Sequence, residues 1–403
     1  MTATAGVAGV APVWRDLVGQ ERVVEALSRA VRSTVGGGSS GVDGSVEGMT
    51  HAWLFTGPPG SGRSTAARAF AAALQCTESG CGSCPSCHTV LGGTHADVLI
   101  VNTRALSIGV NDTRALVARA AHHPAGGRWQ IMVIEDADRL TEQASNALLK
   151  AIEEPTPRTV WLLCAPALED VIPTIRSRCR HLSLRTPSTG AVTDVLVRRD
   201  GVDPSMASFA ARAAQGHIGR AKRLATDEDA RLRRHAVLRL PLSLSRLGPA
   251  LEAAAELVKA ATEEAQESGA PIDLEETEQL RLALGAGTIG RGMVSGAAAQ
   301  LKELEKQQKV RATRFRRDAL DRALVDLASF YRDVLAVQVG AEVELVNEEL
   351  REAVTGVARS SQAETTLCRI DAVLAAREAI AANVAPLLAI EALTVALGAG
   401  SAG

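Results

Sequence analysis

Short apolar runs alternate with amphipathic stretches over the first half of the chain. Each apolar run has four to six residues, too few for a helix, and an unbroken run of this length is typical of a strand buried on both faces of a parallel sheet. The four predicted strands are 52–55, 97–101, 129–134 and 159–164. The helices predicted around them are 20–31, 66–74, 113–122 and 144–154. This alternation predicts an α/β domain with a parallel sheet, whose ligands lie at the carboxyl ends of the strands.

The strand pattern stops after Leu184, and the rest of the chain has helical periodicity only. Residues 192–224 predict a small helical unit. From residue 231 the chain is rich in Ala, Leu, Glu and Arg, with breaks expected near Pro241, 269–271 and 285–292. By composition, 36–48 is expected to be a flexible loop and 398–403 a frayed end. Three domains follow, over 1–186, 187–230 and 231–403.

A glycine-rich turn joins the first predicted strand to the next helix. Residues 57–65 read GPPGSGRST, with the spacing of a phosphate-binding loop, in which backbone N–H groups and a helix N-terminus surround a phosphate. Arg63 stands where such a loop has lysine, and a planar guanidinium does not replace a compact ammonium group. A glycine-rich turn without a ligand is the alternative. The candidate nucleotide-binding residues here are Gly57, Gly60, Gly62, Arg63, Ser64 and Thr65.

An acidic pair, Glu135 and Asp136, follows the third predicted strand. In a hydrolysing site, one carboxylate at this position holds Mg²⁺ and the next orients the attacking water. The usual order is Asp then Glu, and here it is reversed. A solvated strand end is the alternative interpretation.

Four cysteines lie close together in the sequence: Cys76, Cys81, Cys84 and Cys87. Four soft ligands with no open position indicate a structural zinc ion, with an iron–sulfur cluster or free thiols as alternatives. Cys164 and Cys368 lie in apolar surroundings and are expected in the core.

Composition narrows the class of protein. The chain has 403 residues, enough for two or three domains, and its formal net charge of −2 predicts no general affinity for nucleic acids or membranes. No apolar run is long enough for a membrane span, and the start of the chain lacks the features of a signal peptide. Seven cysteines, four of them clustered, suit a reducing compartment. A cytoplasmic protein with no membrane partner is expected.

Several motifs over residues 14–224 together resemble one family, the AAA+ subunits of the bacterial DNA polymerase III clamp loader. The motifs are VGQ at 18–20, HAWLF at 51–55, the 57–65 turn with a cysteine insertion after its helix, NALLKAIEEP at 146–155 and SRC at 177–179. The resemblance implies an AAA+ P-loop sheet with a zinc-binding insertion at 76–87, a helical lid domain and an all-helical collar domain. In that family, three γ or τ motor subunits form a hetero-pentamer with δ and δ′. This ring opens the β sliding clamp and loads it on primed DNA.

Three departures from a motor subunit indicate which member the chain resembles. Arg63 replaces the lysine, the acidic pair is reversed, and 216–219 (GHIG) lacks the expected lid arginine, since Arg220 comes one position late. These losses are similar to those of δ′, a stator-type subunit with a degenerate site. The resemblance therefore implies a subunit of a DNA-directed DNA polymerase, a nucleotidyltransferase. Its own ATPase is expected to be weak or absent, with weak binding of ATP and Mg²⁺ still open.

Arg178 resembles the arginine finger that such a subunit offers in trans to the ATP of its neighbour. A structural arginine paired with a local carboxylate such as Asp170 is the alternative. The second functional hypothesis is a self-sufficient AAA+ ATPase, either a γ/τ-type motor subunit or a relative of a branch-migration helicase. The most basic run, 309–333, is interpreted as a solvated helix face with interleaved acids, in preference to a DNA-binding patch.

Overall fold

The computed structural model describes residues 11–35, 48–103, 106–244, 246–284 and 297–399. The expected break at 285–292 and nearly all of the expected loop at 36–48 lie outside these residues. Of the expected frayed end, 398 and 399 are helical, and 400–403 also lie outside. The chain divides between Thr226 and Asp227 into two compact units, which are described in turn. The predicted domain boundaries at 186 and 230 stay predictions.

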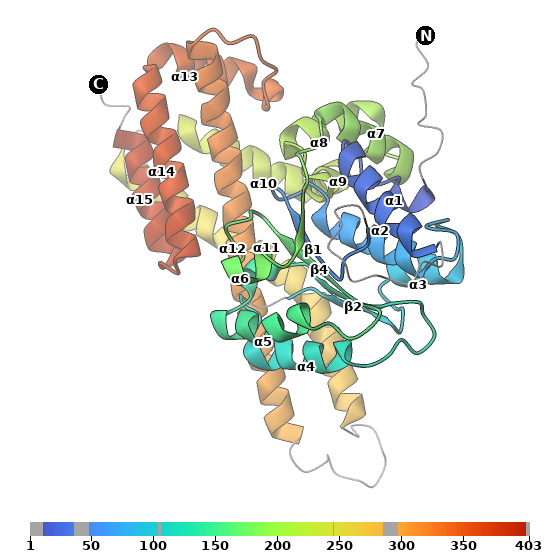
Figure 1. Ribbon diagram of the computed structural model, residues 1–403. Helices are drawn as coiled ribbons and strands as arrows, with labels where there is room; N and C mark the ends of the chain where they lie inside the picture. The colour runs from blue at the N-terminus through green and yellow to red at the C-terminus, as the bar shows by residue number, and fades with distance from the viewer. Residues whose placement is uncertain (1–10, 36–47, 104–105, 245, 285–296, 400–403) are drawn as a thin grey trace. The chain divides into compact units, whose positions relative to one another are not determined.

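The first unit contains the predicted parallel sheet, which is confirmed (Figure 1). Its five strands lie in the order β2-β3-β4-β1-β5. The pattern of apolar runs does not predict β5, because this four-residue edge strand has exposed side chains at every second position. The strands are β1 (Ala52–Thr56), β2 (Val98–Val101), β3 (Gln130–Ile134), β4 (Thr159–Ala165) and β5 (Arg180–Ser183).

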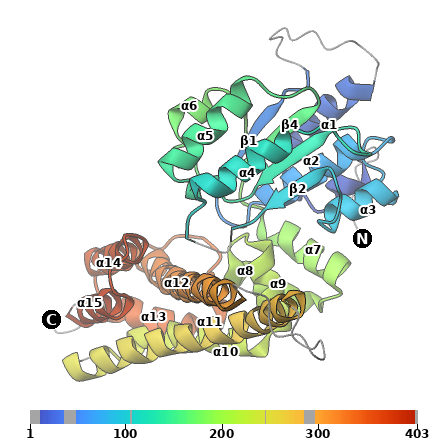
Figure 2. The same cartoon turned by 90° about the horizontal axis from the view of Figure 1, so that it is seen from below.

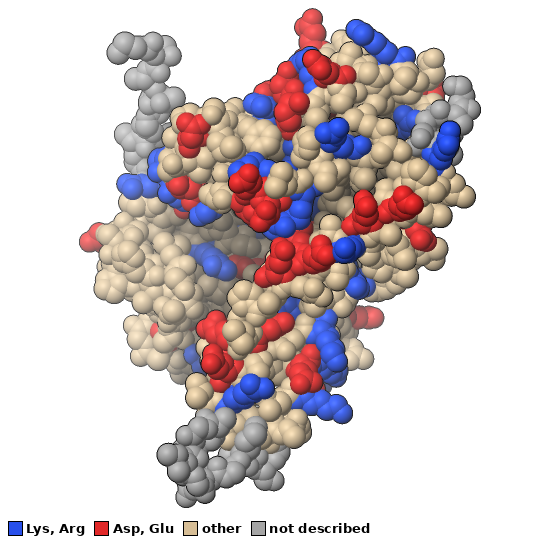
Figure 3. Space-filling model, turned by 180° about the vertical axis from the view of Figure 1, so that it is seen from behind, with Lys and Arg blue, Asp and Glu red and all other residues tan. Residues whose placement is uncertain are grey.

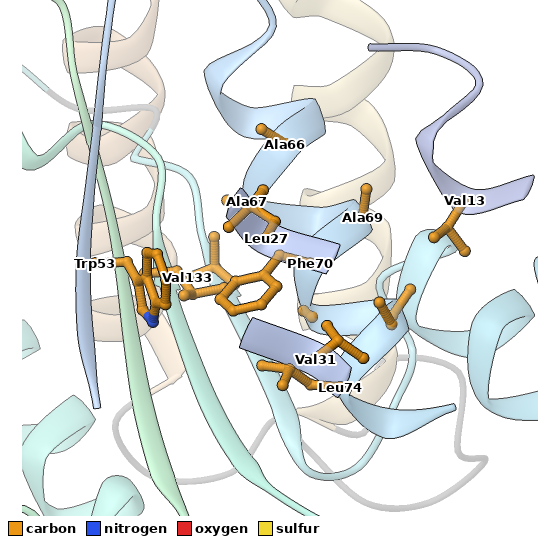
Figure 4. Packing of buried hydrophobic residues seen from close by; sticks show 14 of the residues in the cluster. Val13, Leu27, Val31, Trp53, Ala66, Ala67, Ala69, Phe70, Leu74 and Val133 are labelled. Atoms are coloured by element: carbon orange, nitrogen blue, oxygen red, sulfur yellow. The ribbon is translucent and has the colours of Figure 1, made fainter. Parts of the chain in front are cut away.

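Helices cover both faces of the sheet, so its central strands β1, β3 and β4 are buried on both sides. On one face Trp53 and Val133 pack against α1 and α2, and on the other Leu54 and Met132 pack with residues of α4 and α5. Figure 4 shows the first of these layers, where the rings of Trp53 and Phe70 meet edge to face, 5.0 Å between centroids. The helices of the α/β part are α1 (Glu21–Val35), α2 (Arg63–Gln75), α3 (Pro85–Leu91), α4 (Val110–Ala120), α5 (Glu142–Glu153) and α6 (Pro173–Arg176), with 3₁₀ turns η1 (Pro12–Trp14) and η2 (Ala137–Arg139).

Three helices complete the first unit and pack on one another (Figure 2). Asp203 caps the second of them, its carboxylate accepting from the N–H groups of Ser205 and Met206. Small buried alanines at 207, 210, 211, 213 and 214 let the neighbouring helices approach closely. The three are α7 (Thr189–Asp200), α8 (Pro204–Ala214) and α9 (Ile218–Thr226).

All the secondary-structure elements described in the second unit are helices. Two long helices, α11 and α12, run side by side (Figure 2), and α13, α14 and α15 pack against them around one apolar core. The elements are α10 (Glu228–Arg239), η3 (Leu240–Leu242), α11 (Leu247–Ala283), α12 (Ala297–Gln338), η4 (Glu348–Leu350), α13 (Arg351–Ser360), α14 (Ala363–Ala381) and α15 (Pro386–Ala399).

The break predicted at 269–271 is wrong, because Pro271 lies inside α11. Proline costs about 3 kcal/mol in a helix interior, and the packing of α11 against α12 compensates for it here. Gly269 is buried, and a Cβ atom there would come within 3.9 Å of the Phe315 ring on α12. Arg311 of α12 pairs with Glu276 and Asp273 on the other side of the proline.

The interleaved charges of 309–333 form ion pairs, but the solvated-face interpretation is wrong in part, because Arg311, Asp326 and Asp333 are buried. Arg322 of α12 lies 2.7 Å from Glu264 of α11, and Arg314 lies 3.6 Å from Asp318. Positive and negative side chains are interspersed on the face that Figure 3 shows. No described helix is long and apolar enough to cross a membrane.

None of the seven cysteines forms a disulfide. Cys164 is buried in β4, as predicted, and burial raises the pKa of its thiol. The expectation for Cys368 is wrong, because its side chain is exposed on α14. Apolar neighbours in a helix do not specify which face meets solvent.

Candidate functional site

The 57–65 turn begins at the carboxyl end of β1 and leads into the first turn of α2, where Ser64 and Thr65 lie. Gly57, Gly60 and Gly62 all have positive φ. Glycine is required at Gly60, because a Cβ atom there would overlap His217, just before α9. The hydroxyl of Ser61 is buried and has no hydrogen-bond partner. The loop therefore has the backbone bends of a phosphate-binding loop, with the start of α9 packed against its turn.

Arg63 is folded back on its own loop. Its Nη1 donates to the Gly57 carbonyl oxygen. Burial holds the pKa of the Arg63 guanidinium below its ordinary value, and the carboxylates of Asp138, Asp136 and Asp170 act in the opposite direction. The positive charge of Arg63 therefore lies inside the loop, where the guanidinium is hydrogen-bonded to a carbonyl group of the loop itself.

Glu135 lies at the end of β3, and both of its carboxylate oxygens are engaged. Arg68 of α2 donates through Nε to Oε1 at 2.6 Å, and Asn102, just after β2, donates through Nδ2 to Oε2 at 2.9 Å. The Glu135 side chain is only 6% exposed. Asp136 is half-buried and starts η2. Burial raises the pKa of the nearby Asp138 carboxyl, and the Asp136 carboxylate adds to that rise. The end of β3 is thus acidic, with its first carboxylate satisfied from within the protein.

Gln20 joins the loop to the segment that leads to α7. Its Nε2 lies 3.2 Å from the Ser61 carbonyl oxygen and 2.6 Å from that of Arg185, and its Oε1 accepts from the Arg185 N–H at 3.1 Å. The side chain is 3% exposed. Together with the His217 contact, this bridge fixes the loop relative to the three-helix group.

Arg178 follows α6 and lies on the surface. Its Nη2 lies 2.7 Å from Glu153 Oε1, and its Nη1 donates to the Thr174 carbonyl oxygen at 2.8 Å. The local carboxylate is therefore Glu153 of α5, while Asp170 instead accepts from the Ala167 N–H. The Arg178 side chain is 39% exposed, so it remains accessible.

The four clustered cysteines meet at one point. The ligand sulfurs of Cys76, Cys81, Cys84 and Cys87 lie within 4.8 Å of one another. Cys76 Sγ is 3.6 Å from Cys81 Sγ and 3.8 Å from Cys84 Sγ. A tetrahedral zinc site with Zn–S bonds of about 2.3 Å requires sulfurs roughly 3.8 Å apart. The group can hold a metal ion, and its donor set suits zinc.

The environments of Cys81 and Cys87 shift the pKa values of their thiols in opposite directions. N–H and O–H donation from Ser83, with the Cys84 N–H, lowers the pKa of Cys81 to about 6. Burial raises the pKa of the Cys87 thiol, so that site favours the neutral form until a cation is bound. Arg128 donates to the Cys76 carbonyl oxygen at 2.9 Å, which links the cysteine segment to the start of β3.

Sequence reasoning did not identify Arg68, Asn102 or Glu153. Each lies far along the chain from its partner, and each is an ordinary polar residue for its element. Two of them carried a signal. Asn102 follows a strand adjacent to the one that ends in Glu135, and parallel strands end at the same edge. Glu153 lies in the 146–155 motif, which did not indicate its partner.

Comparison with known proteins finds similarity to subunits of DNA polymerase III. The model for the family described as "DNA polymerase III, delta subunit" matches residues 45–188. The DNA polymerase III subunit delta′ of Bacillus subtilis is 26% identical over 339 residues, which cover 83% of this chain and 87% of that protein.

The gamma/tau subunits are similar over a shorter stretch. The DNA polymerase III subunit gamma/tau of Mycobacterium tuberculosis is 34% identical over 175 residues, 42% of this chain and 28% of that protein. The chain thus spans little more than a quarter of the length of the gamma/tau relatives it matches. Among solved structures, a DNA polymerase III gamma subunit-related protein of Thermotoga maritima is 14% identical, with a TM-score of 0.43 over 94% of this chain and 99% of that one.

Proposed function

We propose that this chain, which is similar to the DNA polymerase III delta subunit family over residues 45–188 and to the delta′ subunit of Bacillus subtilis over 83% of its length, is the δ′-type, stator subunit of a clamp loader. In that role it assembles with γ- or τ-type motor subunits and a δ subunit into a hetero-pentamer. The ring uses ATP to load the β sliding clamp on primed DNA. A cytoplasmic location, where thiols stay reduced, is part of the proposal.

The engagement of Glu135 carries the proposal that this subunit is not itself a motor. In a hydrolysing P-loop site, a carboxylate at the end of this strand holds Mg²⁺. Here Arg68 supplies a fixed positive charge at that carboxylate, and Asn102 takes its other oxygen. The reversed order of Glu135 and Asp136 also displaces each carboxylate by one methylene, and an error of about 1 Å can cost on the order of 100-fold in rate. The residues present therefore do not suit a hydrolysing Mg²⁺–ATP site, although weak nucleotide binding remains compatible with them.

Arg178 is the group through which the subunit takes part in hydrolysis. Its exposed guanidinium can stabilise charge on the γ-phosphate of a nucleotide held by a neighbouring subunit. Structural zinc on the four clustered cysteines supports the architecture of the α/β part, since closed thiolate sites couple metal binding to local folding.

The alternative, a self-sufficient ATPase of the γ/τ or helicase type, is favoured by the 34% identity to the gamma/tau relative. That similarity covers 42% of this chain, whereas the similarity to the delta′ relative covers 83%. The hydrogen bonds from Arg68 to Glu135 and from Arg63 to the Gly57 carbonyl oxygen weigh against a motor role.

Reconstitution with candidate γ/τ and δ chains tests the proposal. Arg178→Ala should leave the chain folded and assembled, yet lower clamp loading strongly and total ATPase activity partly. A finger supplied by another subunit is worth about 1,000- to 100,000-fold at its own site, while the other motor sites keep their fingers. Arg114→Ala, which removes an exposed arginine on α4, is the control and should behave as wild type. An Arg178→Ala complex that loads clamps at the wild-type rate would refute the proposed role.

A further inference from the structure

The arginine used by the proposed function is held by a carboxylate from a different helix. Glu153 is the last residue of α5, and its Oε1 lies 2.7 Å from Arg178 Nη2. The other terminal nitrogen, Nη1, donates to the Thr174 carbonyl oxygen at 2.8 Å and to Ser177 Oγ at 3.2 Å. Acceptors on both terminal nitrogens define the orientation of the guanidinium plane.

We propose that Glu153 is a positioning residue for Arg178. It holds the guanidinium in the orientation in which it meets the nucleotide of a neighbouring subunit, and it does so through the 2.7 Å ion pair between its Oε1 and Arg178 Nη2. The inference rests on the proposed function. A free arginine side chain samples many rotamers and loses entropy when it is fixed in one of them. When the group is oriented in advance, this loss no longer adds to the activation barrier.

The hydrogen-bond count of the guanidinium fits this role. It has five N–H groups. Two of them, both on Nη1, donate hydrogen bonds, and Nη2 forms the ion pair with Glu153. The Nε–H group and the second N–H of Nη2 remain for an incoming ligand, enough for a bidentate contact with a phosphate. Glu153 therefore holds the side chain without consuming all of its donors.

Because both side chains of the pair are exposed, a positioning role can be distinguished from a contribution to protein stability. The Arg178 and Glu153 side chains are 39% and 45% exposed, and exposed ion pairs contribute little to stability. Glu154 offers a matched control, because it is also an exposed glutamate at the same end of α5. Removing either carboxylate changes the charge near the α5 carboxyl end equally, but only Glu153 is paired with Arg178.

The experiment uses the reconstituted complex, with the P-loop lysine substituted in every motor subunit except the one adjoining this chain. Glu153→Ala should lower the kcat of that site about two- to fivefold, the range expected for losing one exposed charged contact. The KM for ATP should not change, since the contact matters in the transition state. Glu153→Gln keeps the size of the side chain but removes the charge of the ion pair, and should lower kcat about as much as Glu153→Ala does. Glu154→Ala should leave kcat unchanged.

A double-mutant cycle gives the decisive readout. In an Arg178→Ala background, Glu153→Ala should have no further effect on kcat, because the group it positions is gone. Equal losses in both backgrounds, or a Glu153→Ala complex with wild-type or higher kcat, would overturn the inference. If Arg178→Ala itself leaves the activity of this site intact, the proposed finger role fails first, so the two failures are distinguishable. Thermal unfolding of each isolated chain checks that the variants fold.

Discussion

Arg68 Nε lies 2.6 Å from Glu135 Oε1 and ties the helix after the phosphate-binding loop to the end of β3. The glutamate side chain is 6% exposed and the arginine 36%. A carboxylate that is nearly excluded from water requires a cation or several donors close by. Arg68 and Asn102 provide both from within the chain. The acidic end of β3 is therefore held in place by residues of the folded structure itself.

Removing Arg68 should destabilise the first unit. Arg68→Met leaves Glu135 charged, buried and bonded to Asn102 alone, which should cost about 1–3 kcal/mol. Urea unfolding followed by tryptophan fluorescence measures this loss in the right unit, because all four tryptophans lie in the first unit. Adding Glu135→Gln should recover part of the loss by removing the unpaired charge.

Arg29→Met is the control for Arg68→Met. Arg29 pairs with Glu25 one turn away on α1, at 3.0 Å, and both side chains are largely exposed. Its removal should cost less than about 0.5 kcal/mol. Equal losses for the two variants would show that burial of Glu135 contributes nothing.

ATP turnover by the isolated chain should be far below that of a motor subunit. Arg63→Lys with Glu135→Asp and Asp136→Glu restores the usual motif residues, yet Arg68 still faces position 135. Turnover, measured as phosphate release, should therefore rise more when Arg68→Ala is added to the triple variant than when Arg29→Ala is added. Wild-type chain that hydrolyses ATP at a motor subunit's rate would contradict the stator proposal.

Zinc should be present at one ion per chain, bound by the four clustered cysteines. Cys84→Ser should lose the metal and loosen the segment around α3 while the sheet stays folded, because closed thiolate sites couple metal binding to local folding. Elemental analysis and circular dichroism measure the two effects. Cys368→Ser removes an exposed thiol and should keep the full metal content. Iron with sulfide, or no metal in the wild type, would reject a zinc site.

Asp97 should make stability depend on pH. Burial alone would raise its pKa, but N–H groups of Ala125, Gly126 and Gly127 donate to the carboxylate and hold the pKa below its ordinary value. A carboxyl whose folded pKa lies below the unfolded value of about 3.9 adds stability above that pH and loses it as the pH falls through the folded pKa.

Asp97→Asn should therefore cost about 1–2 kcal/mol at pH 7, and its difference from wild type should shrink below about pH 4. Urea unfolding followed by tryptophan fluorescence at several pH values measures both effects. Asp194→Asn, at an exposed position of α7, is the control and should show no such trend. A difference that is constant over the whole pH range would contradict the mechanism.

Much of the sheet could be predicted from the sequence because its signals are local. An apolar run such as 159–164 is typical of a strand buried on both faces of a covered parallel sheet, and β4 lies there. The spacing of Cys81, Cys84 and Cys87 brings three sulfurs together on one turn, and Cys76, the fourth predicted ligand, lies with them in the structure. The glycines of the 57–65 turn likewise specify backbone bends that few other residues adopt.

Features that depend on distant partners could not be predicted. The edge strand β5 has exposed side chains at alternate positions and forms only by pairing with β1. Pro271 indicates a helix break by itself, but packing against α12 outweighs its local cost. Cys368 is apolar in its local context, yet its face of α14 is exposed.

The sequence by itself determined which chemical groups are present, a glycine turn with Arg63, an acidic pair and four cysteines, because these patterns depend on neighbours in the chain. Only the tertiary structure decided what those groups contact. Arg68 reaches Glu135 and Glu153 reaches Arg178 because the sheet brings separate helices and strand ends together. Side-chain pairing across such separations depends on the packed fold, and no local spacing encodes it.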